Sequence, residues 1–129
     1  MSDVDKRGLN LKEFPVWRKS VTPMTWATGA GHAAKTQTIA VNGIIKRIVM
    51  TISSVTGAPN VTATITDDLG NVIFSTGAKA HNTSNIFDEG ELGSDAFCVC
   101  GDIIITVDPD ADAGGAGQLL TVQFDMYGI

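Results

Sequence analysis

From residue 38 onward, apolar and polar positions alternate along the chain with a period of two. The segment 61–66 alternates without a fault, with apolar residues on one side and threonines on the other. This pattern is typical of an antiparallel strand that has one face buried and one face in water. The segments that alternate, or are short and apolar, are 48–53, 61–66, 72–76, 96–100, 103–107 and 120–127.

Turn signals separate these segments. Residues 67–71 predict a hairpin turn, because Gly70 and Asn71 tolerate a positive φ. Residues 41–43 predict another turn, and residues 101–102 predict a bend or bulge. Six to eight short strands separated in this way indicate an all-β fold, an antiparallel β-sandwich or jelly-roll-like domain, and leave the strand topology open.

The first 37 residues lack this periodicity. Pro15, Pro23 and the small-residue run 27–34 interrupt any regular element, yet the segment contains both tryptophans of the chain. A segment that stays in water rarely carries such side chains. We therefore expect an extended N-terminal arm over residues 1–37 that docks on a surface, followed by the β-sandwich domain over residues 38–129.

Two destinations for the arm stay open. Its aromatic side chains either fold back onto the core of their own domain or anchor on a neighbouring subunit, where buried tryptophans often dominate the binding energy. On the second interpretation, the residues predicted to contact a partner are Phe14, Val16, Trp17, Arg18, Lys19, Met24 and Trp26.

The overall charge is acidic but unevenly distributed. The 129 residues carry a net charge of −5, which argues against direct nucleic-acid binding. Residues 1–47 hold eight of the nine Lys and Arg and three of the 14 acids, a net of +5, while residues 48–129 hold only Lys79 against eleven acids, a net of −10. Two interpretations stay open: the asymmetry arises by chance and serves solubility, or the basic head lies on an acidic surface, either that of its own body or that of a neighbouring copy.

Candidate chemistry is sparse. The acidic loop 108–117 departs from a calcium loop at Ala113 and Leu119, so a solvated turn is expected and cation binding stays open. Cys98 and Cys100 share one face of a strand and are expected to pack in the core as thiols. His32 and His81 lack any metal-ligand or triad spacing. We expect no enzymatic activity, no cofactor and no metal site.

Two segments carry a resemblance to known proteins. Residues 61–73 resemble the threonine-rich hairpins of bacterial and phage immunoglobulin-like modules. Together with residues 38–48, they make the chain similar to small virion proteins of tailed bacteriophages, in particular capsid cement (decoration) proteins. The resemblance implies a homotrimer located in the virion and made in the host cytoplasm. It also implies binding to the major capsid protein, to copies of the chain itself, or to both.

Two other functions remain open. A phage tail or fibre module that recognises a receptor or glycan would need aromatic residues on its loops, but loops 78–94 and 108–117 hold only Phe87. A head-to-tail connector component would form a ring. No apolar stretch reaches the roughly 20 residues of a membrane span, and no apolar signal segment stands at the N-terminus, so no membrane contact is expected.

Overall fold

The computed structural model describes residues 16–88, Leu92 and residues 97–129. Within this part the chain forms eight antiparallel strands, which confirms the all-β prediction. They are β1 (Trp17–Ser20), β2 (Met24–Ala27), β3 (Lys35–Ile52), β4 (Asn60–Asp67), β5 (Val72–Ala80), β6 (Thr83–Phe87), β7 (Phe97–Pro109) and β8 (Leu119–Gly128).

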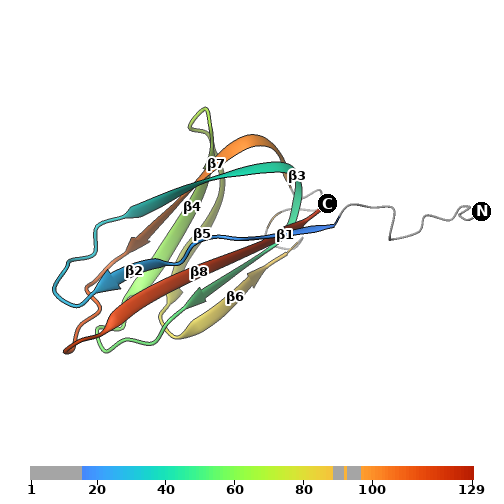
Figure 1. Cartoon of the computed structure of the whole chain (residues 1–129). Coiled ribbons are helices and arrows are strands. Elements are labelled where there is room, and N and C mark those ends of the chain that lie inside the picture. The colour runs from blue at the N-terminus through green and yellow to red at the C-terminus, as the bar shows by residue number, and fades with distance from the viewer. Residues whose placement is uncertain (1–15, 89–91, 93–96) are drawn as a thin grey trace, which may run out of the picture.

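The strands make one curled sheet whose two halves face each other as in a sandwich (Figure 1). The strand order is β1-β8-β3-β7-β4-β5, with β2 also paired to β8 and β6 also paired to β3. Strand β3 belongs to both halves. Its residues 35–45 pair with β7, its residues 45–52 pair with β8, and its residues 48–52 also pair with β6 on the other side.

The predicted turn at residues 41–43 is wrong, because β3 continues through it. The ladder between β3 and β7 runs unbroken from Lys35 to Ile45. Gly43 has a φ of +145°, which glycine tolerates, and the register with β8 shifts between Ile45 and Arg47. The strand therefore bends from one half of the sheet into the other, where a turn was expected. The bend or bulge predicted at 101–102 does not interrupt the ladder either, because β7 pairs with β3 through Gly101 and Asp102; Gly101 has a φ of +105° there.

The core lies between the two halves and is built by alternating residues. In β4 the apolar residues Val61, Ala63 and Ile65 are buried and the intervening threonines are half-buried, as predicted. The hairpin predicted over residues 61–73 is confirmed as β4 and β5. The largest fully buried side chains are Phe124, Ile45, Ile48, Met50, Ile52, Ile65, Ile103, Ile105, Leu120, Met126, Val61 and Val107.

The sheet begins earlier in the chain than predicted. Strands β1 and β2, which precede the predicted boundary at 37/38, pair with β8, and β3 begins before that boundary, at Lys35 (Figure 1). Pro23 lies between β1 and β2, where the pairing of this segment with β8 is interrupted; proline has no N–H to donate to a sheet. The backbone N–H of Val21 still donates to the carbonyl of Phe124 at 3.0 Å. Residues 17–27 thus form one interrupted edge of the sheet, and Phe14 lies outside the described residues.

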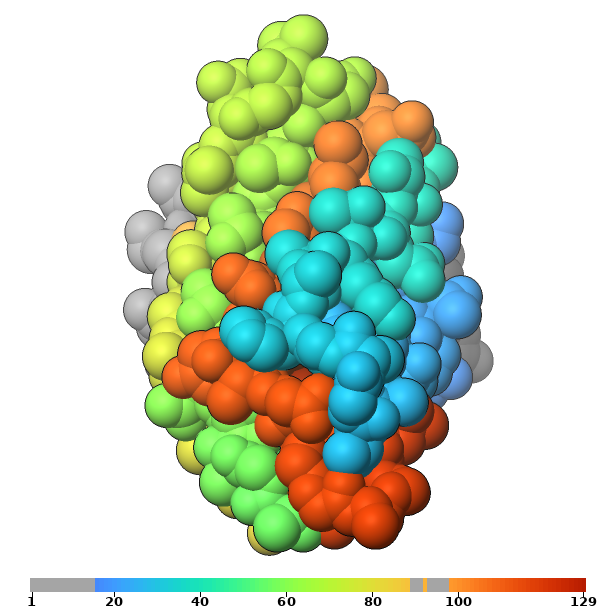
Figure 2. Space-filling model, turned by 90° about the vertical axis from the view of Figure 1, so that its left-hand side faces the viewer, coloured from blue at the N-terminus to red at the C-terminus, as the bar shows by residue number. Residues whose placement is uncertain are grey.

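The segment 28–34, between β2 and β3, lies over the loop 110–118 between β7 and β8 (Figure 2). Figure 2 shows the first segment in cyan against the second in orange. Thr28 donates its hydroxyl to the carbonyl of Gly114 at 3.0 Å, and the ring Nδ1 of His32 lies 3.1 Å from the carbonyl of Pro109. These bonds fix both loops.

Candidate functional site: a basic corner on strands β1, β8 and β3

Three side chains form a row across the outer face of the sheet. Tyr127 on β8 pairs with Arg18 on β1 and with Arg47 on β3, and residues paired in this way project from the same face. Both arginines are exposed and the tyrosine is half-buried. Adjacent strands lie about 4.8 Å apart, so two guanidinium groups flank the phenol with backbones separated by roughly 10 Å. Such a row presents many hydrogen-bond donors to carboxylates.

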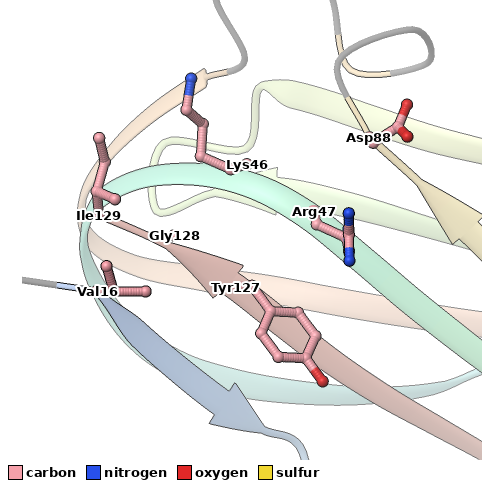
Figure 3. A pocket seen from close by; sticks show the side chains of 7 residues that line it. All are labelled: Val16, Lys46, Arg47, Asp88, Tyr127, Gly128 and Ile129. Carbon is pink, nitrogen blue, oxygen red and sulfur yellow. The ribbon is translucent and has the colours of Figure 1, made fainter. Parts of the chain in front are cut away.

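A hollow of about 470 Å³ lies beside this row (Figure 3). The residues that line it are Val16, Lys46, Arg47, Asp88, Tyr127, Gly128 and Ile129. In Figure 3, Val16 and Ile129 lie at one end of the hollow, and Arg47 and Tyr127 lie at the other. Val16 is 70% exposed and Ile129 is 39% exposed. The hollow therefore has its two exposed apolar side chains at one end, with Lys46 beside Ile129, and Arg47, Tyr127 and Asp88 toward the other end. We name Arg18, Lys46, Arg47 and Tyr127, with this hollow, the basic corner.

Trp17 holds the start of β1 in place behind this corner. Its indole lies directly on two glycines: a Cβ on Gly128 would come within 2.5 Å of its Cζ2, and a Cβ on Gly43 within 2.9 Å of its Nε1. That nitrogen is buried and finds no hydrogen-bond partner among the described residues. Only glycine leaves room for the ring at these two positions, so the bend in β3 and the end of β8 shape the corner.

A second, smaller hollow of about 300 Å³ lies on the other side of β1. It is lined by Trp17, Arg18, Lys19, Ala40, Val41 and Asn42. The ammonium group of Lys19 donates to the carbonyl of Ala40 at 2.7 Å, which ties β1 to the first half of β3. Lys19 therefore has a structural role here in addition to its charge.

The structure divides the predicted partner-contact residues into two groups. Val16, Trp17, Arg18 and Lys19 line the two hollows. Met24 and Trp26 do not, because they lie in the chain's own core.

This is a correction of the predicted contact set. Met24 and Trp26 are 4% and 3% exposed and pair with Val122 and Leu120 of β8. The indole Nε1 of Trp26 donates to the carbonyl of Ala33 at 2.7 Å. A side chain buried in this way has no surface left for a partner, so the first of the two destinations left open for the arm applies to these residues.

Two carboxylates of the acidic loop accept hydrogen bonds from backbone N–H groups of the loop itself and of two other segments. Asp112 accepts hydrogen bonds from the backbone N–H groups of Gly114, at 3.0 Å, and Gly29, at 3.2 Å, and these bonds lower the pKa of its carboxyl. Asp110 accepts from the N–H of Asn60 at 2.8 Å. Within the described part of the chain, no three His, Cys, Asp or Glu side chains gather as metal ligands.

The prediction that both cysteines pack in the core is wrong. Cys98 and Cys100 share one face of β7, as predicted, but that face is exposed. Val99 between them is 7% exposed and pairs with Gly43 of β3. The register with β3 thus turns Val99 inward and both thiols outward.

Each histidine holds a loop. His32 contacts Pro109 as described above, and Nδ1 of His81 accepts a hydrogen bond from the N–H of Val55 at 3.2 Å. Sequence reasoning missed Tyr127, whose only signal was its position on the polar side of an alternating strand. The basic doublets Arg18-Lys19 and Lys46-Arg47 lie far apart in the sequence, and no local pattern brings them together.

The fold is that of an all-β, antiparallel sandwich-like domain, and the corner gives it a surface that carries several cationic side chains. No protein-family model matches the chain, and no curated protein matches its sequence. Two solved structures are similar in fold to 88% of the chain. They are infectious bursal disease virus of the Gx strain (14% identity, TM-score 0.43) and of the Gt strain (13% identity, TM-score 0.41).

The similar region is a part of those viral chains. It covers 31% of the Gx-strain chain and 32% of the Gt-strain chain. In the residues that the structure describes here, no helix has the length and apolar character needed to span a membrane.

Proposed function

We propose that this protein is a non-enzymatic structural component of a virion, of the capsid cement (decoration) type. It binds the capsid lattice, and its partners are the major capsid protein, copies of itself, or both. The observation that carries the proposal is the basic corner. An acidic domain displays two cationic side chains, a tyrosine, one carboxylate and two exposed apolar side chains around one hollow, with Arg18 beside the tyrosine on the neighbouring strand.

The corner suits protein recognition by its mixture of chemistry. Guanidinium groups bind carboxylates with two parallel hydrogen bonds, and tyrosine and arginine are enriched where binding energy concentrates. Val16 and Ile129 add apolar surface beside them. An acidic, partly apolar segment of a neighbouring subunit matches this surface.

Binding of this kind stabilises an assembled shell by mass action. A protein that binds neighbouring subunits only in the assembled lattice shifts the equilibrium toward that lattice. The glycine-lined packing of Trp17 fixes the corner in advance, so little conformational entropy is lost on binding. Repetition over many lattice sites multiplies a modest gain per copy.

The test is co-sedimentation with particles assembled from the major capsid protein encoded in the same genome. Wild-type protein should sediment with the particles, and Arg47→Glu should bind at least tenfold more weakly. Lys79→Glu is the matched control, since it makes the same charge change on β5 and should bind as wild type. Failure of the wild-type protein to bind any such particle would overturn the proposal, and so would equal loss of binding in both variants.

A further inference from the structure

We propose that the partner seated in the basic corner is a second copy of this chain, and that it inserts the tip of its β4–β5 hairpin. The hairpin tip is residues 67–72. This inference rests on the proposed function, because it names one occupant of the same surface.

The hairpin tip is an exposed apolar point. Leu69, within the turn, is 83% exposed, and Val72, the first residue of β5, is 64% exposed. The turn stands at one end of the molecule (Figure 2). When a partner covers an apolar side chain that is this exposed to water, the complex is stabilised, by about 1.5–3 kcal/mol for complete burial of a leucine.

The tip is held rigid by one carboxylate. Asp67 accepts hydrogen bonds from the backbone N–H of Leu69 at 3.0 Å, the N–H of Asn71 at 2.8 Å and the side-chain amide of Asn71 at 3.0 Å. Gly70 supplies a φ of +87°. The bonds from Asn71, followed by that from Leu69, lower the pKa of the Asp67 carboxyl. A segment ordered before binding pays little entropy on binding.

The charges of the tip and the corner are opposite. Asp68 is exposed next to Leu69, and one of its carboxylate oxygens would lie 3.5 Å from a Cβ on Gly101, which places it beside the exposed Asp102. In the hollow of the basic corner, Val16 and Ile129 lie at one end with Lys46 beside them, and Arg47 lies toward the other end, where Asp88 also lines the hollow (Figure 3). Leu69 therefore matches the end that holds Val16 and Ile129, and Asp68 matches the guanidinium of Arg47.

The contact must join two molecules. Leu69 is 83% exposed, so the tip does not lie in the corner of its own chain, and in the strand order β3 and β7 lie between β8 and the β4–β5 hairpin. Tip and corner are different surfaces, which makes the interface head-to-tail. Such interfaces close into rings when the rotation between copies allows it and otherwise extend.

The experiment is light scattering behind a sizing column, on full-length proteins whose folding is checked by circular dichroism. The tip variant is Leu69→Asp and the corner variant is Arg47→Glu. Leu119→Asp is the matched control for the first, because Leu119 is a 50% exposed leucine on another surface, and Lys79→Glu is the control for the second. Wild type and both controls should exceed the 13.5 kDa of one chain, and each test variant should associate at least tenfold more weakly.

Mixing the two variants gives the sharpest result. The tip variant keeps an intact corner and the corner variant keeps an intact tip, so the mixture should reach twice 13.5 kDa and stop there. A mixture that stays monomeric, a wild type that is monomeric at every concentration, or a Leu69→Asp protein with wild-type mass would each overturn the inference. A monomeric wild type that still sediments with capsid particles through Arg47 would leave the proposed function standing.

Discussion

Replacing Trp26 by alanine should destabilise the isolated protein strongly. The side chain is 3% exposed and lies in the core, where β2 pairs with β8. Truncation of a buried tryptophan to alanine costs about 3–5 kcal/mol through lost burial and the cavity left behind. The loss of its hydrogen bond to Ala33 adds less than about 1 kcal/mol, because that carbonyl belongs to an exposed residue and water replaces the donor.

The expected loss of roughly 4 kcal/mol is a large share of the 5–15 kcal/mol typical of a domain. For a urea slope of about 1.5 kcal/mol per M, it lowers the unfolding midpoint by roughly 2–3 M. Far-UV circular dichroism in urea measures it, at a protein concentration low enough to avoid association. Val16→Ala is the control, since Val16 is 70% exposed and should change stability by less than about 0.5 kcal/mol.

The result that would refute this reasoning is a Trp26→Ala protein within 0.5 kcal/mol of wild type, a margin set by the typical effect of surface substitutions. It would mean that β2 contributes nothing to the isolated fold. Trp26 would then again be interpreted as part of an arm, residues 1–37, that docks on another subunit.

Three further predictions concern the corner, the thiols and the hairpin. Gly128→Ala should cost about 1–3 kcal/mol in urea unfolding, since the added Cβ would strike the Ile44 carbonyl and come within 2.5 Å of the Trp17 ring. Cys98 and Cys100 should both react with Ellman's reagent without denaturant, and their protection until unfolding would show them to be buried. The pKa of Asp67 is lowered in the folded state, so its contribution to stability is complete above about pH 3.8 and is lost as the pH falls through the lower folded value. The protection of the Leu69 amide against hydrogen exchange, measured relative to its intrinsic exchange rate at each pH, should therefore fall only at acid pH, and its loss already at neutral pH would contradict the bond to Asp67.

Strand identity and the hairpin were predictable from the sequence alone. In 61–66 every second residue is apolar, and this period permits only one face to be buried. Asp67 and Gly70 have the chemistry of a tight turn, and the structure uses both in that way. These predictions succeed because neighbouring residues along the chain supply all the information.

Other assignments depended on partners distant in the sequence. The apolar run 96–100 has no polar residue to show which face is inside, so only the pairing of Val99 with Gly43 decided that the thiols point outward. The turn expected at 41–43 became a bend because β7 pairs through it. Residues 17–27 lack an extended alternation of apolar and polar positions, yet they form two strands because they pair with the edge of β8.

The basic corner is likewise a product of the tertiary structure. The sequence determined that this chain has a basic head, an acidic body and an all-β fold, because charge count and periodicity are local properties. The fold decided that Arg18, Tyr127 and Arg47, more than 100 residues apart at the extremes, form one row. Their meeting follows from backbone hydrogen bonds among three strands whose register is set by burial of their inner faces, and no short segment of the sequence contains that register.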